Sequence, residues 1–223
     1  MKEILLDTET TGLSSVKDKI IEIACIEIED HIPTGKKFHF FLNPEMEISQ
    51  GAYETHGITR EFLQDKPKFK DIAKEFQEFI NEKKLVIHNA DFDLAFLNKE
   101  LKEVELPIIS NVNVIDTLNV AREKFPGAQN SLDALCKRFK IDNSRRQKHS
   151  ALLDCELLAK VYIELFDKKE PSLEFNMDKD EPIVRNLKTL KNREHLIQEI
   201  TSEEEELYKK FLKKDLPKST MLN

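Results

Sequence analysis

Two acidic residues separated by one position, Asp7 and Glu9, follow a short apolar run near the start of the sequence. The run over 3–7 predicts a buried strand, and the polar residues over 8–12 predict the turn that ends it. Side chains two positions apart on a strand point to the same face, so the two carboxylates lie together. They repel each other unless a cation lies between them. An acidic pair of this kind, taken alone, is common at solvated strand ends.

A second acidic group follows the apolar triplet at 85–87. A strand that runs into a helix here delivers one acidic side chain to the carboxyl end of the strand, where open α/β sheets gather their ligands. Asp91 and Asp93 compete for that position. We select Asp93 as the inward carboxylate because Phe92 and Phe96 flank it as apolar anchors. Asp91 can instead cap the following helix, and the pattern alone fits that role equally well.

A third group, His149 and Asp154, stands at the start of a predicted helix after the polar segment 143–148. A step of five residues at about 100° per residue separates the two side chains on a regular helix. We therefore place His149 in a mobile loop and Asp154 in the first turns of the helix. This suits a movable base beside a fixed metal ligand, although in isolation a surface histidine and an unrelated helical aspartate explain the segment better.

The three groups together indicate a metal-dependent site. Four carboxylates on one sheet provide the hard oxygen ligands that Mg²⁺ or Mn²⁺ prefers. With a histidine nearby, they can assemble a two-metal centre for phosphodiester hydrolysis.

The elements that must position these residues form a mixed sheet with helices packed on it. Segments 19–28 and 36–42 are rich in β-branched and aromatic residues and alternate in polarity, so with the first strand they predict a three-stranded meander. Helical spacing of apolar residues appears over 69–80. Further strands are predicted at 85–87 and 112–115, and further helices over 93–101, 132–139 and 151–166. This order indicates the α/β class.

The composition is that of a folded chain. Its 223 residues are 39% hydrophobic and 35% charged, with 5 Gly and 8 Pro, which excludes collagen-like, disulfide-stapled and wholly disordered classes. No apolar run approaches the about 20 residues of a membrane-spanning helix, and the first residues turn polar too soon for a signal peptide. Three scattered cysteines fit a reducing compartment. We expect a soluble, cytoplasmic protein with no membrane association.

The excess negative charge lies in the first three quarters of the sequence. Residues 1–167 hold 23 basic and 30 acidic side chains, and with them the whole net charge of −7. Such a region lacks the positive field that grips a phosphate backbone. If it acts on nucleic acid, it needs metal ions, a partner, or both.

A change of composition after residue 166 predicts three parts. Residues 1–166 hold the catalytic domain, and residues 167–183 are charged and interrupted by proline, as is typical of a flexible linker. Residues 184–223 form a short tail with a capped, amphipathic helix over about 201–214. About forty residues cannot bury a core alone, so the apolar stripe of this helix must dock on the main domain or on another protein.

In their order and spacing, the three motifs resemble the DEDDh branch of 3′–5′ exonucleases. The resemblance rests on Asp7-Thr-Glu-Thr-Thr-Gly-Leu13, His88-Asn-Ala-Asp-Phe-Asp93, and His149 followed five residues later by Asp154. It spans residues 1 to about 166. It implies a ribonuclease H-like mixed sheet, in which an antiparallel meander of three strands is continued by parallel strands and flanked by helices.

The resemblance also implies roles for individual residues. It implies that Asp7, Glu9, Asp93 and Asp154 are ligands of two divalent ions, Mg²⁺ or Mn²⁺, and that His149 is the general base. The substrate contacts that it implies are Asp7, Glu9, Gly12, Leu13, His56 and Asp154.

Leu13 and Gly51 can each be compared with a position in this family. Leu13 resembles the apolar wedge that lies against the terminal base in this family. Gly51 stands where some relatives carry a glutamate that contacts the 3′-hydroxyl, so that contact is in doubt in this chain.

Within this branch, the sequence resembles the epsilon (proofreading) subunits of bacterial DNA polymerase III, including the stretch 130–136. That family joins a nuclease domain through a linker to a segment that binds the polymerase subunit. The resemblance implies two partners, a DNA 3′ terminus and, through residues 184–223, a polymerase subunit. Tethering would offset the weak DNA affinity of an acidic domain.

The predicted linker contains a hexapeptide, Glu170–Phe175, that resembles a sliding-clamp-binding peptide. Glu170 stands in place of the usual Gln. An ordinary linker explains this segment equally well.

Two other functions stay open on the sequence. A free-standing exonuclease that trims RNA or DNA shares every catalytic residue but does not need the tail. A catalytically silent scaffold is the third class, and the intact carboxylates and His149 argue against it.

Overall fold

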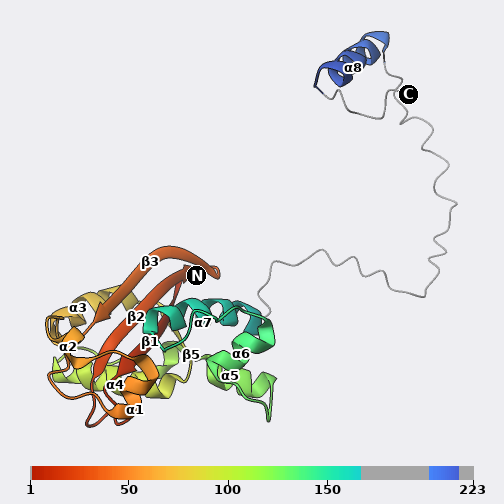
Figure 1. Cartoon of the computed structure of the whole chain (residues 1–223). Helices are drawn as coiled ribbons and strands as arrows, with labels where there is room; N and C mark the ends of the chain where they lie inside the picture. The colour runs from red at the N-terminus through yellow and green to blue at the C-terminus, as the bar shows by residue number, and fades with distance from the viewer. Residues whose placement is uncertain (1, 167–200, 216–223) are drawn as a thin grey trace. The chain divides into compact units, whose positions relative to one another are not determined.

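The computed structural model describes residues 2–166 and 201–215 (Figure 1). The predicted linker at 167–183, its hexapeptide Glu170–Phe175, and the rest of the predicted tail lie outside the described residues. Within the described ranges, no helix is both long enough and apolar enough to cross a membrane.

A five-stranded mixed sheet in the order β3-β2-β1-β4-β5 lies at the centre of residues 2–166. Strands β1 (Lys2–Thr10), β2 (Ile20–Glu29) and β3 (Ile32–Phe41) pair antiparallel. Strand β4 (Lys84–Ile87) pairs parallel with β1, and β5 (Val114–Asp116) pairs parallel with β4. The predicted α/β fold, with a meander continued by parallel strands, is therefore confirmed.

Strand β1 continues past the end that the sequence predicts for it. Thr8 and Glu9 pair with Ile23 and Glu22 of β2, and the register shifts only between Glu9 and Thr10. The β-branched threonines fit the pleated sheet and override the polar turn signal. The acidic pair therefore stands within a regular strand, which fixes its direction.

Helices cover both faces of the sheet. α3 (Phe69–Ile80) and α4 (Ala90–Glu103) pack on the face that presents Leu6. α7 (Ala151–Leu165) packs on the opposite face, which presents Leu5. Because successive strand residues alternate in direction, the mostly apolar β1 contributes to two cores at once.

Three helices agree closely with their predicted ranges, and α4 does not. α7 follows its predicted range of 151–166 to within one residue. α3 has the predicted bounds, and so does α6 (Leu132–Phe139), which lies beside α7 (Figure 1). α4 begins ahead of the predicted residue 93, since Asn89 takes a left-handed conformation with φ of 71° at its N-cap. The strand predicted at 112–115 is confined to β5, because Asn111–Asn113 form a turn of 3₁₀ helix.

Three short helices are absent from the sequence-based expectation. They are α1 (Gln50–His56), α2 (Arg60–Leu63) and α5 (Thr117–Lys124). Each begins at a polar N-cap, Ser49, Thr59 or Asp116, whose side chain accepts a hydrogen bond from a backbone N–H of the first turn. α1 and α2 have seven and four residues, and α5 buries only Thr117 and Ala121, so none of the three shows an apolar pattern that distinguishes a helix from a turn.

A helix also forms in the predicted tail, α8 (Ser202–Asp215). Thr201 and Glu204 build a capping box: Thr201 Oγ1 accepts from the Glu204 N–H at 3.3 Å, and Glu204 Oε2 accepts from the Thr201 N–H at 2.9 Å. Leu207 and Phe211 are 65% and 50% exposed. The helix thus presents an apolar surface.

Candidate active site

A cleft of about 990 Å³ opens where the carboxyl end of β1 meets the turn after β4. The parallel pairing of the two strands brings these segments to one edge of the sheet. All of the site residues that the sequence predicts line this cleft: Asp7, Glu9, Gly12, Leu13, His56, Asp93, His149 and Asp154. Segments far apart in the sequence therefore converge on one site.

Asp7 and Glu9 project from the end of β1 toward this cleft, and Glu9 is only 8% exposed. Burial raises the pKa of Glu9 to about 8, and the charges of Asp154 and Glu22 add to the rise. The pKa of Asp7 is raised well above its usual range, first by burial and then by the charges of Asp93 and Asp154. Both carboxylates therefore lack the positive charge that would make ionisation favourable.

Asp93, and not Asp91, is the inward carboxylate at the start of α4. Asp93 is 3% exposed, whereas Asp91 is exposed to solvent. Thr8 Oγ1 donates a hydrogen bond of 2.6 Å to Asp93 Oδ1. Burial nevertheless raises the pKa of Asp93 to about 7. The N-cap of α4 is Asn89, so the structure does not use Asp91 as a cap.

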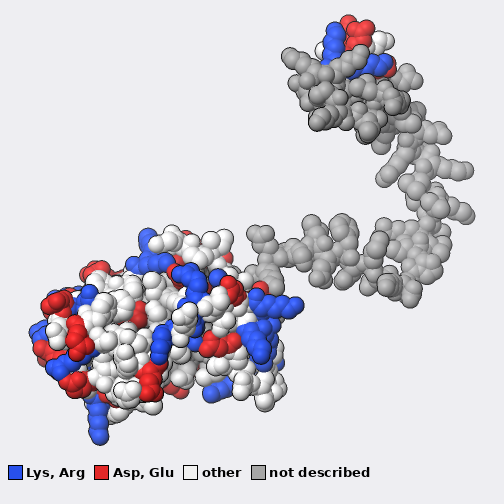
Figure 2. Space-filling model, viewed as in Figure 1, with Lys and Arg blue, Asp and Glu red and all other residues white. Residues whose placement is uncertain are grey.

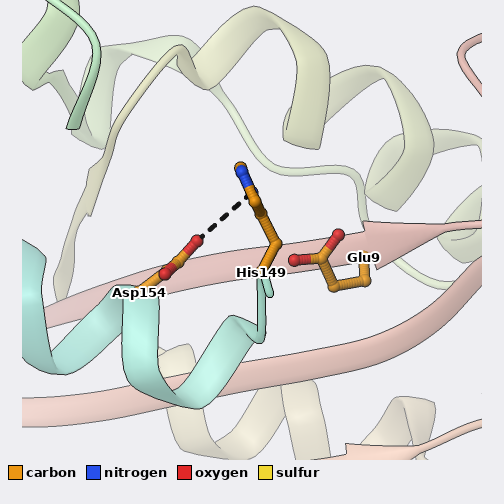
Figure 3. A group of neighbouring side chains, drawn as sticks. All are labelled: Glu9, His149 and Asp154. Carbon is orange, nitrogen blue, oxygen red and sulfur yellow. Dashed lines mark ion pairs between the residues drawn. The ribbon is translucent and has the colours of Figure 1, made fainter. Parts of the chain in front are cut away.

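Asp154 and His149 lie side by side, opposite Glu9 (Figure 3). Asp154 is in the first turn of α7, and His149 lies in the segment just before that helix. His149 Nδ1 is 3.6 Å from Asp154 Oδ2, and ligand atoms of all three residues lie within 4.8 Å of one another. Burial, and then the charge of Arg146, lowers the pKa of His149, so the imidazole is neutral at pH 7.

Arg146 also belongs to this site, although no motif in the sequence points to it. Its guanidinium side chain is 6% exposed. Nε donates to Asp154 Oδ1 and Nη2 donates to Asp154 Oδ2, each at 2.6 Å. Nη1 donates to Asp133 Oδ2 at 2.6 Å, and Nη2 is 2.9 Å from His149 Nδ1. The sequence shows only two adjacent arginines in a polar segment, a pattern that does not separate a buried arginine from a solvated one.

The predicted substrate contacts differ in their surroundings. His56 is 6% exposed, and its Nδ1 accepts a hydrogen bond from the Ile58 N–H at 3.0 Å. Its buried Nε2 has no hydrogen-bond partner among the described residues. Leu13 is 89% exposed at the rim of the cleft.

The two glycines of interest differ in steric freedom. A Cβ at Gly12 would lie 2.6 Å from a carboxylate oxygen of Asp18, so a larger residue there would displace the Asp18 side chain, which accepts a hydrogen bond from the Ser14 N–H. A Cβ at Gly51 would meet nothing within 4 Å. Packing therefore does not explain the absence of a larger residue at Gly51.

The surface charge of residues 2–166 is mixed on the face that Figure 2 shows. Acidic and basic side chains alternate over the visible face of residues 2–166 (Figure 2). This matches the net negative charge of the region and provides no broad basic surface on that face for nonspecific DNA binding.

Comparison with known proteins identifies the family. A family model described as Exonuclease matches residues 4–162. The chain belongs to this exonuclease family.

Curated relatives of this exonuclease extend the match beyond the nuclease region. The chain is 46% identical to DNA polymerase III subunit epsilon of Rickettsia conorii, over 97% of both chains. It is 42% identical to DNA polymerase III subunit epsilon of Buchnera aphidicola subsp. Acyrthosiphon pisum, over 99% of this chain and 98% of the relative. The exonuclease therefore belongs with the epsilon subunits, and the predicted resemblance is confirmed.

Solved structures agree on the fold. The exonuclease superposes on Exonuclease X in complex with 5′ overhanging duplex DNA with a TM-score of 0.58 and 28% identity, covering 74% of this chain and 92% of that chain. It superposes on the nuclease domain of 3′hExo, a DEDDh family member bound to rAMP, with a TM-score of 0.63 and 17% identity, again over 74% and 92%. The second likeness shows the ribonuclease H-like fold alone.

DEDDh exonucleases use divalent metal ions, and the residues of this cleft fit such a cation. The donors are carboxylate oxygens, which hard cations prefer. Burial and mutual repulsion raise the pKa values of Asp7, Glu9 and Asp93, and a bound cation would reverse that effect.

Proposed function

We propose that this exonuclease is the proofreading subunit of a replicative DNA polymerase III and removes mismatched 3′-terminal nucleotides from DNA. The observation that carries the proposal is the convergence of four carboxylates, with His149 beside Asp154, in one cleft. Relatives named DNA polymerase III subunit epsilon, at 42–54% identity, support the biological role.

In this proposal Asp7, Glu9, Asp93 and Asp154 would hold two divalent ions, Mg²⁺ or Mn²⁺, and the close approach of Glu9 to Asp154 supports such a site. Such ions, when bound, supply positive charge to the scissile phosphate and lower the pKa of water. The carboxylates hold the ions and thereby orient the terminal phosphodiester. Thr8 fixes the direction of Asp93 through its hydrogen bond.

His149 takes the proton of the attacking water. Its lowered pKa keeps the ring neutral at pH 7, as a base requires, and a positioned base typically contributes about 10²–10⁴ in rate. Its place in a segment outside the regular helix lets the ring adjust to the substrate.

The terminal nucleotide enters between the rim and the carboxylates. The exposed side chain of Leu13 packs against the terminal base, and Gly12, which lines the cleft beside it, lies next to the nucleotide. His56 Nε2, which lacks a partner among the described residues, donates a hydrogen bond to the substrate. Asp7, Glu9 and Asp154 line the same cleft and would meet the phosphate through the ions that they hold.

We further propose that residues 1–166 form the exonuclease domain, 167–183 a flexible linker, and 184–223 the segment that binds the polymerase subunit. The exposed apolar side chains of α8, Leu207 and Phe211, support this assignment. Replacing both by Asp in the full chain should abolish co-purification with the polymerase subunit. Lys210→Ala on the same helix is the control, and retained co-purification of the double variant would contradict the assignment.

Contact with the sliding clamp through Glu170–Phe175 remains a prediction. It is supported only if Leu173→Ala together with Phe175→Ala abolishes clamp binding by the full chain.

The decisive experiment presents the full chain with primers that end in a paired or a mismatched 3′ nucleotide, with Mg²⁺ or with EDTA. We expect Mg²⁺-dependent release of single nucleotides, faster from the mismatched end because a frayed terminus reaches the cleft more easily. Release from RNA but not from DNA would favour a trimming exonuclease. No release from either substrate would identify a silent scaffold.

A further inference from the structure

One side chain, Arg146, brings positive charge to the carboxylates of the cleft. Its Nε and Nη2 atoms donate to the two carboxylate oxygens of Asp154, one each at 2.6 Å. This is the bidentate pairing that makes arginine–carboxylate contacts strong and directional. Both oxygens of one proposed metal ligand are therefore engaged by the protein itself.

The same guanidinium also engages His149. Nη2 lies 2.9 Å from Nδ1 of the imidazole. A guanidinium has donors and no acceptor, so Nδ1 must supply the lone pair of this hydrogen bond. The neutral ring then carries its proton on Nε2, which leaves neither ring nitrogen able to accept another proton. Arg146 thus covers a proposed metal ligand and the proposed base together.

Asp133 anchors the guanidinium from a third side. It lies in the first turn of α6, its side chain is 53% exposed, and its Oδ2 accepts from Arg146 Nη1 at 2.6 Å. This contact uses the one guanidinium nitrogen that faces neither Asp154 nor His149. Arg146 can therefore keep a partner on α6 while it gives up its contacts with Asp154.

We propose that Arg146 is a latch that a divalent ion must displace: it closes the metal-free site by pairing with Asp154 and His149, and metal binding frees both. The inference rests on the proposed function, since it takes Asp154 as a metal ligand. A cation and the guanidinium both carry positive charge to the same two oxygens of Asp154, so occupancy by one opposes occupancy by the other. Metal binding would then expose the base only when the site is ready for substrate.

The test measures Mn²⁺ binding to the full chain without nucleotide, by calorimetry, for the wild type and three variants. Arg146→Gln removes the competitor and should lower the Mn²⁺ dissociation constant by about tenfold or more, the scale of charged hydrogen bonds. Arg146→Lys keeps the charge without the fork, and its constant should fall between the two. Arg145→Gln makes the same charge change at an exposed neighbour and should stay within about twofold of the wild type.

A second readout follows the His149 ring by ¹⁵N NMR. Adding Mg²⁺ to the wild type should shift the Nδ1 resonance as its hydrogen bond is lost, and metal-free Arg146→Lys should already show part of that shift. Arg146→Gln that binds Mn²⁺ no more tightly than the wild type would overturn the latch. If Arg146→Gln does not fold, an Nδ1 resonance that Mg²⁺ leaves unchanged in the wild type would do the same. A wild-type chain that binds no Mn²⁺ at all would instead refute the proposed function.

Discussion

The fold buries carboxylates in two places, at Glu27 on β2 and in the cleft at Asp7, Glu9, Asp93 and Asp154, and the charge around these two groups differs. Glu27 on β2 has a side chain that is 1% exposed, with Lys83 Nζ at 2.9 Å and Lys2 and Lys36 at 3.8 and 3.9 Å. The hydrogen bond from Lys83 is the main reason that the pKa of Glu27 is lowered. Three lysines of the fold therefore balance the negative charge of this carboxylate.

The carboxylates of the cleft have the opposite balance. Asp7, Glu9 and Asp93 have raised pKa values because they are buried and face other acids, and the guanidinium of Arg146 is committed to Asp154 and Asp133. A buried carboxylate that is paired with cations of the protein stabilises the fold. A cluster of buried carboxylates with too few such cations is a position where a cation from solution can bind.

The contributions of the two groups to the stability of the fold should change with pH in opposite directions. The pKa of Glu27 is lower in the folded chain than its ordinary 4.5, so its stabilisation is present above that value and is lost as the pH falls. The pKa of Glu9 is raised to about 8, so its contribution is fully present below 4.5 and is lost as the pH rises through about 8.

The largest effect should come from Asp7→Asn. Without one carboxylate the proposed metal site loses several kcal/mol of charge stabilisation, and the rate of nucleotide release should fall by about 10⁴-fold. The melting temperature of the metal-free variant at pH 8 should rise, since the raised pKa of Asp7 costs stability at this pH and asparagine does not titrate. Asp91→Asn, an exposed neighbour of the site, is the control and should change neither quantity. Near-normal activity of Asp7→Asn would contradict the view that the carboxylates of the cleft bind a cation whereas Glu27 only stabilises the fold.

His149→Gln should separate catalysis from metal binding. The turnover number should fall by about 10²–10⁴-fold because the base is lost. The rise in melting temperature on adding Mn²⁺ should persist, because the carboxylates remain. Single-turnover nuclease assays and thermal unfolding on the same preparation measure both. Wild-type turnover at neutral pH would refute the assignment of the base.

Metal addition should stabilise the chain more at high pH than at low pH. At a metal concentration about a hundredfold above the dissociation constant, the gain is about 2.7 kcal/mol, or on the order of 5–10 °C. The gain should shrink between pH 8 and pH 6, where Glu9 and Asp93 take up protons in the metal-free chain. EDTA should reverse it. An equal gain at both pH values would show that the carboxylates are ionised without metal.

Glu27→Gln should have the smallest effect, confined to stability. Loss of its charged hydrogen bonds should lower the free energy of unfolding by about 1–3 kcal/mol near neutral pH, with unchanged metal affinity and turnover. Urea unfolding measures the first quantity. Glu29→Gln, exposed on the same strand, is the matched control. A change in metal affinity of Glu27→Gln would mean that the two groups are coupled.

The sequence determined those parts of the fold that depend on neighbouring residues. The helices at 69–80 and 132–139 have the predicted bounds because each repeats an apolar pattern over two or more turns. The positions of the strands along the chain follow from segments that alternate in polarity and are rich in β-branched residues. The acidic pair of β1 and its common face follow from strand geometry alone, although the strand runs further than its local signals suggest.

Other features of the site could not be predicted from local sequence patterns. These patterns did not decide whether Asp91 or Asp93 points into the site, and in the structure only Asp93 is buried at the start of α4. The contacts of Arg146 with Asp133 and Asp154 depend on the packing of α6 against α7. Residue types and spacing specify which groups are available. Only the tertiary structure decides which of them become neighbours, because distance in space and removal from water set the charge balance of the cleft.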